Sequence, residues 1–118
     1  MPFVTFTTNV PEDKLGQNFN QKLNKGLAEA IPEKPYELFA IHVISTDKFT
    51  FGGTNEPAAM IQITAFGIYT PQSCKKYSKS IGEFLQKEVG LSPTRVLIQF
   101  ADLPATHCGF NLTTCDEL

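Results

Sequence analysis

Residues 1–11 read MPFVTFTTNVP and predict a β-strand that begins at Pro2. Proline is tolerated at the first position of a strand, where its missing N–H is not needed, so the simplest interpretation is a strand at the edge or end of a sheet. No basic segment precedes an apolar run, and we therefore do not expect a signal peptide here.

Pro2 has a second interpretation, because a small residue after Met1 favours removal of the methionine. The exposed proline would carry a free secondary amine on a rigid ring. A terminal amine titrates at about 7.7–8.0, so only roughly a tenth is neutral at pH 7. An apolar pocket and a neighbouring ammonium both lower that pKa, and a fall of about two units would make Pro2 a candidate general base. A chain that keeps Met1 has an amide at this position and no base.

Length and composition restrict the class of protein. The 118 residues suffice for a single domain spanning 1–118, and 42% hydrophobic with 19% charged residues is typical of a soluble globular chain. No run approaches the roughly 18 apolar residues of a membrane span, so no membrane insertion is expected. The net charge of −2, with Arg95 as the one arginine, argues against nucleic acid as a partner.

The three cysteines, Cys74, Cys108 and Cys115, form no CxxC pair. A zinc site built from His107, Cys108 and Cys115 would need an unusual ligand spacing. We therefore expect free thiols, and neither a metal nor a cofactor.

The first half of the chain predicts a helix followed by a strand. Apolar residues recur at every fourth position from Leu15 to Ile31, which indicates an amphipathic helix of about 18 residues that Pro32 ends. Residues 37–44 are nearly all apolar and predict a strand covered on both faces.

The second half repeats this plan. Residues 59–66 and 96–100 predict strands, and the tail after residue 103 predicts loop with at most short strands. Between the two strands, Thr70 and Pro71 are typical of a helix start, and Gly90 of a helix end.

A shift of 58 residues superposes the two halves. It places Phe19 on Tyr77, Leu23 on Ile81, Leu27 on Leu85, Ile31 on Val89 and Pro35 on Pro93. The sequence therefore predicts an α+β, two-layer sandwich: a tandem β-α-β pseudo-repeat, about 1–50 and 59–103, with a four-stranded mixed sheet and two helices on one face. The other face needs a cover, and further copies of the chain are the simplest candidate.

Several short motifs, taken in order, resemble the macrophage migration inhibitory factor family, which includes D-dopachrome tautomerase. They are Met-Pro-Phe-Val at 1–4, Thr-Asn-Val-Pro at 8–11, Lys34-Pro35, Phe-Gly-Gly at 51–53, Glu56-Pro57, Ser-Pro-Thr-Arg-Val at 92–96 and Gly-Phe-Asn-Leu-Thr-Thr at 109–114. The resemblance covers essentially the whole chain.

The resemblance implies a homotrimer with a pocket between adjacent subunits and the terminal proline at its base. It implies keto–enol tautomerase activity on a small aromatic α-keto acid or a dopachrome-like compound. It also implies a cytoplasmic protein or one secreted by a route without a signal peptide, because some members act outside cells as cytokine-like signals.

Site residues follow from the resemblance position by position. Pro2 matches the catalytic base, and Lys34 matches the lysine that meets the substrate carboxylate. Phe66 matches a position whose backbone N–H binds substrate, Gln99 an asparagine whose amide does so, and Phe110 an aromatic residue of the pocket wall.

The sequence also departs from the family pattern. Leu38 and Leu97 stand where the best-known member has tyrosines, so the pocket should be more apolar. Gln99 is one methylene longer than asparagine, and Phe66 puts a ring near the mouth. Residues 57–61 lack the CxxC of one branch, so its thiol-oxidoreductase activity is not expected.

Three functions remain open from the sequence. The first is a tautomerase. The second is a signalling ligand that binds a cell-surface receptor and keeps a vestigial pocket. The third is an inactive relative, which the departures at Phe66, Leu97 and Gln99 suggest.

Overall fold

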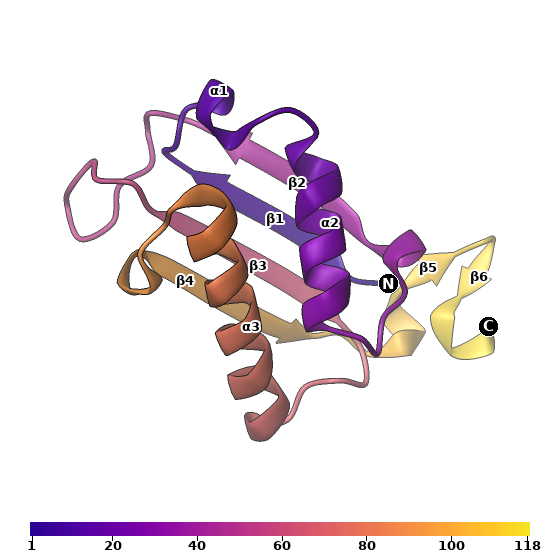
Figure 1. Ribbon diagram of the computed structural model, residues 1–118. Helices are drawn as coiled ribbons and strands as arrows, with labels where there is room; N and C mark the ends of the chain where they lie inside the picture. The colour runs from indigo at the N-terminus through magenta and orange to yellow at the C-terminus, as the bar shows by residue number, and fades with distance from the viewer.

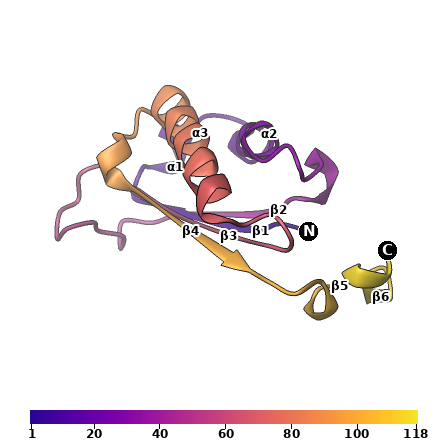
Figure 2. The ribbon, with the colours of Figure 1, turned by 90° about the horizontal axis from the view of Figure 1, so that it is seen from below.

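The computed structural model describes residues 1–118 and forms two layers, a four-stranded sheet with helices lying on one of its faces (Figure 1; Figure 2). The strands follow the order β2-β1-β3-β4 across the sheet. They are β1 (Phe3–Thr8), β2 (Ala40–Ser45), β3 (Ala59–Ala65) and β4 (Val96–Asp102). β1 and β2 are parallel, as are β3 and β4, whereas β1 and β3 are antiparallel. The predicted α+β class and tandem β-α-β plan are confirmed.

β1 lies inside the sheet, so the expectation of an edge or end strand is wrong. Pro2 can precede an interior strand because it stays just outside the ladder. Its carbonyl oxygen accepts the Ala40 N–H at 3.0 Å, and no donor is required from its nitrogen. The N-terminus therefore lies beside the segment that leads into β2.

The predicted 18-residue helix is interrupted. It is divided into α1 (Glu12–Leu15) and α2 (Phe19–Ala30), because Gly16 (φ 90°) and Asn18 (φ 60°) between them have positive φ angles that do not fit a right-handed helix. Leu15 and Phe19 are nevertheless both buried, so the apolar stripe is preserved across the break. α2 ends at Ala30, since a residue before proline disfavours the helical conformation.

The second long helix, α3 (Pro71–Val89), begins and ends where the sequence predicts. The Ser73 N–H donates to Thr70 Oγ1 at 3.0 Å, and the Thr70 N–H donates to Ser73 Oγ at 2.8 Å, which forms a capping box. Gly90 (φ 78°) closes the other end. None of the helices combines the length and apolar character needed to cross a bilayer.

The remaining elements are short. One-turn 3₁₀ helices span Tyr36–Leu38, Pro93–Arg95, Ala105–His107 and Cys115–Glu117, and the tail forms a hairpin of β5 (Gly109–Phe110) and β6 (Thr113–Thr114). Figure 2 shows this tail extending past the end of β4. The expectation of a tail with at most short strands is confirmed.

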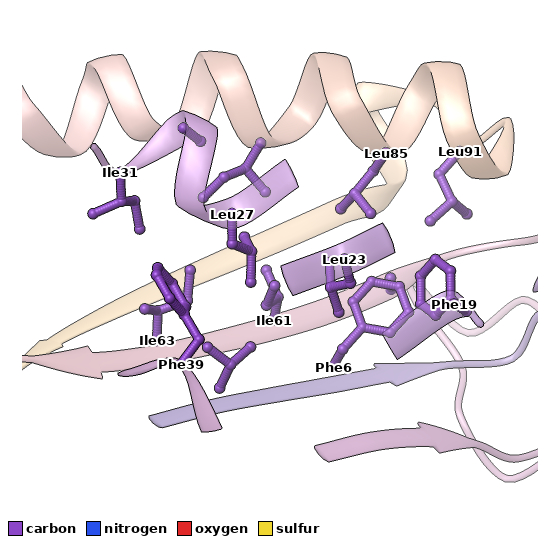
Figure 3. Packing of buried hydrophobic residues seen from close by; sticks show 14 of the residues in the cluster. Phe6, Phe19, Leu23, Leu27, Ile31, Phe39, Ile61, Ile63, Leu85 and Leu91 are labelled. Atoms are coloured by element: carbon purple, nitrogen blue, oxygen red, sulfur yellow. The ribbon is translucent and has the colours of Figure 1, made fainter. Parts of the chain in front are cut away.

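The core lies between the two layers (Figure 3). Leu23 and Leu27 of α2 meet Ile61 of β3 and Ile81 and Leu85 of α3, and none of the five has exposed surface. Full burial stabilises the folded chain by about 1.5–3 kcal/mol for each such side chain.

The opposite face of the sheet carries no helix. β2 starts at Ala40 rather than residue 37 and lies at the sheet edge, where Ala40 and His42 are exposed. The single chain therefore covers one face of β2, and the cover of its other face by further copies stays a prediction. Large apolar side chains are also exposed here: Phe3 (46%), Met60 (37%) and Leu97 (57%).

The loop 50–57 joins the two halves and is held by Arg95. Gly52 (φ 60°) and Gly53 (φ 77°) form its turn. The Arg95 guanidinium donates to the carbonyl oxygens of Phe51 at 2.9 Å and Glu56 at 2.8 Å. This side chain therefore fixes the loop against the start of β4.

Candidate functional site

The N-terminal end of β1 brings the chain's free amine beside a lysine. Pro2 is less than 2% exposed, and its nitrogen lies in the peptide bond to Met1, so the free amine in this structure belongs to Met1. Burial first and the charge of Lys34 second lower the pKa of this amine below its usual 8.0. The environment therefore makes this amine easier to deprotonate than a terminal amine in water.

Lys34 is held in the turn between α2 and β2. Its N–H donates to the Ile31 carbonyl oxygen at 3.1 Å, and Pro35 follows it. The Lys34 Nζ lies 3.8 Å from the centre of the Phe66 ring, a cation–π contact. No carboxylate pairs with it, because the chain's one ion pair joins Lys79 and Glu83. Its half-buried ammonium keeps hydrogen-bond donors for an anion.

Phe66 adds a second unused donor. It directly follows β3, and its backbone N–H donates to no backbone or side-chain oxygen in the chain. Buried or half-buried N–H groups normally have a partner. Phe66 therefore offers the Lys34 ammonium an aromatic face and offers a ligand a backbone donor.

Leu97 and Gln99 do not join this group within one chain. Alternation along a strand directs Pro2, Val4 and Phe6 to the helix side, whereas Leu97 and Gln99 of β4 belong to the helix-free side. The Gln62 side-chain amide donates to Gln99 Oε1 at 2.8 Å. Leu97 lines a separate shallow hollow of about 210 Å³ together with Phe49, Thr50, Phe51, Gly52 and Met60.

Leu38 and Phe110 occupy the segments around the N-terminal end of β1. Leu38 is half-buried in the 3₁₀ turn that follows Lys34-Pro35. Phe110 is 44% exposed on the β5–β6 hairpin. Both have apolar surface available, but the isolated chain does not close them into a pocket with Gln99.

The family description "Macrophage migration inhibitory factor (MIF)" matches residues 1–116. The chain belongs to the MIF family. It is 36% identical over 115 residues to the macrophage migration inhibitory factor of Xenopus tropicalis, covering 97% of this chain and 98% of the relative. The Mus musculus factor is 33% identical over 114 residues, with 97% and 98% covered.

Solved structures of MIF proteins have the same fold. The factor from Oncomelania hupensis matches with a TM-score of 0.85 at 25% identity, covering 94% of this chain and 80% of that one. The Trichinella spiralis factor matches with a TM-score of 0.86 at 24% identity, covering 95% and 98%. The MIF family belongs to the tautomerase superfamily, its members are commonly homotrimeric, and membership supports a function of the tautomerase or cytokine type.

A larger hollow, of about 580 Å³, lies at the other end of β2, between that strand and the break that separates α1 from α2. His42 and Glu12 are the titratable residues that line it. No lysine or arginine side chain lines it, so we place the candidate site at the N-terminal end of β1, where the Lys34 ammonium is unpaired.

Sequence reasoning missed one contact near this site. The Cys115 thiol donates to Cys108 Sγ at 2.9 Å, and both cysteines oppose the lowering of the pKa of the terminal amine. The spacing of seven residues around a short turn was the available signal, but it is recognisable only once the hairpin is known. His107 does not join them in a metal site, since no group of three or more His, Cys, Asp or Glu side chains is arranged to hold a metal.

Proposed function

We propose that this chain is a keto–enol tautomerase of the phenylpyruvate or dopachrome type and that Pro2 is its general acid and base once Met1 has been removed. The observation that carries the proposal is the terminal amine held beside Lys34 in surroundings that lower its pKa. Removal of Met1 converts the Pro2 nitrogen from an amide into the terminal amine, and this nitrogen belongs to a buried ring.

The reaction needs only one mobile proton. A neutral Pro2 amine takes the proton from the enol oxygen of the substrate, and the resulting ammonium returns a proton to the carbon next to the carbonyl. The double bond moves from C=C to C=O, so no oxidant, reductant or cofactor takes part. A base with a pKa near the working pH suits both transfers.

Lys34 and Phe66 supply the substrate contacts on the helix side. The unpaired Lys34 ammonium binds the substrate carboxylate, and the cation–π contact with Phe66 fixes its direction. The free backbone N–H of Phe66 donates to the same carboxylate or to the adjacent oxygen. An aromatic substituent then packs against Leu38 and Phe110.

The pocket is completed by a second copy of the chain. Gln99 and Leu97 face away from Pro2 in their own subunit, so they reach a substrate only from a neighbour. A homotrimer would also cover Phe3, Met60 and Leu97 on the helix-free face of the sheet. Sedimentation of the purified protein tests this assembly, and a single-chain species at working concentration would contradict it.

The decisive experiment replaces Pro2 with glycine, a residue small enough to allow the same removal of Met1. Loss of the ring amine should lower kcat/KM for phenylpyruvate enol by about 100-fold or more, in line with the contribution of a general acid or base. Intact mass establishes that Met1 is absent, and circular dichroism establishes folding.

A matched control keeps the proline but blocks its nitrogen. An alanine inserted between Met1 and Pro2 leaves an amide at Pro2 whether or not Met1 is removed. This protein should be as inactive as Pro2→Gly. Wild-type turnover by either variant would contradict Pro2 as the base.

The second candidate is a cytokine-like ligand with a vestigial pocket. It is favoured by Leu38 and Leu97, whose side chains supply no hydroxyl donor. Receptor binding by the Pro2→Gly protein separates the two functions. Wild-type binding without catalysis supports the signalling function, whereas loss of both binding and catalysis supports a function that depends on the Pro2 site. Wild-type protein with neither turnover nor binding would indicate an inactive relative.

A further inference from the structure

The C-terminal hairpin places two cysteines opposite one another. β5 and β6 pair Gly109 with Thr114 and Phe110 with Thr113. Continuing this register by one residue places Cys108 opposite Cys115, and the Cys115 N–H donates to the Cys108 carbonyl oxygen at 2.8 Å. Directly opposed residues of an antiparallel pair have Cα atoms about 4.5–5.5 Å apart, which is within the range that a disulfide spans.

The two sulfur atoms are already in contact. The Cys115 thiol donates to Cys108 Sγ at 2.9 Å, and both thiols are free. An S–S bond is about 2.05 Å long, so the sulfurs need to approach by about 0.9 Å to form one. Cys74 has no such partner: it lies on α3, near Tyr69 and Tyr77.

The hairpin gains from a covalent closure. Its two-residue turn is Asn111 (φ 55°) and Leu112 (φ 66°), and leucine is disfavoured in this left-handed conformation. Leu112 is fully exposed and contributes no burial. A two-stranded hairpin alone is only marginally stable, so a cross-link at its base would restrict the segment that carries Phe110.

We propose that Cys108 and Cys115 form a reversible disulfide at the base of the C-terminal hairpin, in exchange with small-molecule disulfides. This site does not depend on the proposed tautomerase activity. It adjoins the same end of the sheet, since Lys34 and the terminal amine both act electrostatically on Cys115.

The exchange proceeds in two balanced steps. The half-buried Cys115 thiol loses its proton and attacks one sulfur of the small disulfide, which releases one thiolate. Cys108, whose side chain is buried, then loses its proton and attacks the Cys115 sulfur, which releases the second thiolate. Two protein thiols and one disulfide become one protein disulfide and two small thiols.

The hydrogen bond to Cys108 raises the pKa of the Cys115 thiol, and burial raises it further. The thiolate is the attacking form, so the rate of oxidation should increase as pH rises above neutrality.

The test exposes the full-length reduced protein to oxidised glutathione. Free thiols should fall from three to one per chain, and the mass should drop by two hydrogen atoms. Digestion with trypsin shows which cysteines form the bond. Residues 96–118 contain Cys108 and Cys115 but neither lysine nor arginine, so they form one peptide, and Cys74 lies in a different one. The lost hydrogens should be found in peptide 96–118, and dithiothreitol should restore all three thiols.

Two variants and one condition complete the test. Cys74→Ser should form the same bond, whereas Cys108→Ser should keep a glutathione on Cys115 because the second thiol is missing. The ratio of internal disulfide to glutathione adduct should be about tenfold or more higher in the folded protein than in the urea-unfolded chain, because the fold holds the two sulfurs together.

Four results would overturn the proposal. They are a peptide 96–118 that stays reduced, one that carries two glutathiones, a bond between chains or to Cys74, and an equal yield in urea.

Discussion

The two β-α-β halves share one turn but use it differently. Lys34-Pro35 leads from α2 into β2, and Ser92-Pro93 occupies the equivalent place between α3 and β4. Pro35 directly precedes a one-turn 3₁₀ helix, and Pro93 is the first residue of another. Ser92 is satisfied locally, because its hydroxyl oxygen accepts the Thr94 N–H at 3.3 Å. Lys34 has no such partner in its own turn and extends to the ring of Phe66 in the other half. A repeated turn thus serves structure in one half and offers an unpaired charge in the other.

The helices of the two halves differ in how their ends are capped. α3 has a capping box at its start and Gly90 at its end. α2 has no side-chain cap and starts after Asn18 in a left-handed conformation. The first half therefore depends more on packing against the second, and one contact between the two helices illustrates this. The shift of 58 residues places Gly26 on Phe84, and these two equivalent positions contact each other.

The largest expected effect comes from replacing Lys34, the residue that distinguishes the first turn from the second. Lys34→Gln removes the charge that would bind the substrate carboxylate, a hydrogen bond worth about 1.5–3 kcal/mol. The kcat/KM of the processed enzyme should fall by about 10- to 150-fold, mainly through KM. Because Lys34 lowers the pKa of the terminal amine, its loss should raise that pKa and move the acid limb of the pH–rate profile to higher pH.

Ser92→Ala is the control for Lys34→Gln. It alters the equivalent turn, so it should reduce stability by at most about 1 kcal/mol and leave kcat/KM and the pH profile unchanged. Equal losses of activity in the two variants would show that the turns support the fold alike and would remove Lys34 from the site.

The next effect tests the helix contact. A Cβ built on Gly26 lies 2.5 Å from a ring carbon of Phe84, so Gly26→Ala forces the ring to move. Overpacking costs about 1–3 kcal/mol, and the better helix propensity of alanine offsets about 1 kcal/mol of it. Urea unfolding should show a net loss of up to about 2 kcal/mol.

Gly82→Ala provides the matched comparison within α3, because no atom lies within 4 Å of its added Cβ. It should stabilise the protein by about 0.5–1 kcal/mol. Combining Gly26→Ala with Phe84→Leu should cost less than the sum of the two single changes. Additive losses would mean that the ring does not resist the new methyl group.

Local signals in the sequence predicted the helices and strands. The features that it did not predict depend on contacts between residues far apart in the chain. Thr70, Pro71 and Gly90 act within one helical turn of α3, and its bounds were predicted correctly. The break at Gly16 and Asn18 was missed because Leu15 and Phe19 remain buried four residues apart although the backbone between them is not helical. The interior place of β1 depends on pairing with β2 and β3, which alternation in one strand cannot specify.

The candidate site could likewise be predicted only in part from the sequence. Resemblance to the family identified Lys34 and Phe66, and the structure shows these two in contact. It does not bring Gln99 to them within one chain, because the face of β4 on which Gln99 lies requires a neighbour for any shared pocket. The pairing of Cys108 with Cys115 could not be predicted, since Asn111-Leu112 is a poor hairpin signal compared with Asn-Gly.

The smallest effect concerns Tyr77, which the shift of 58 places on Phe19. Both rings are buried, but the Tyr77 hydroxyl donates to Glu33 Oε1 at 2.8 Å, and so links α3 to the turn beside Lys34. Tyr77→Phe makes the halves alike at this position and should reduce stability at pH 7 by less than about 1 kcal/mol, because Glu33 is exposed to solvent.

The pH dependence distinguishes this bond from simple packing. The hydrogen bond from Tyr77 lowers the pKa of Glu33, so its contribution is present above the pKa of the unfolded carboxyl and is lost as pH falls through the lower folded value. Urea unfolding should therefore show the wild-type advantage over Tyr77→Phe shrinking in acid.

Burial, followed by the bond to Glu33, raises the pKa of Tyr77 to about 12. The advantage should thus also fall above about pH 10, where the unfolded tyrosine ionises first. Tyr69→Phe is the control: its hydroxyl donates to the Ile63 carbonyl oxygen at 2.9 Å, and an acid-dependent loss there would disconnect the effect from Glu33.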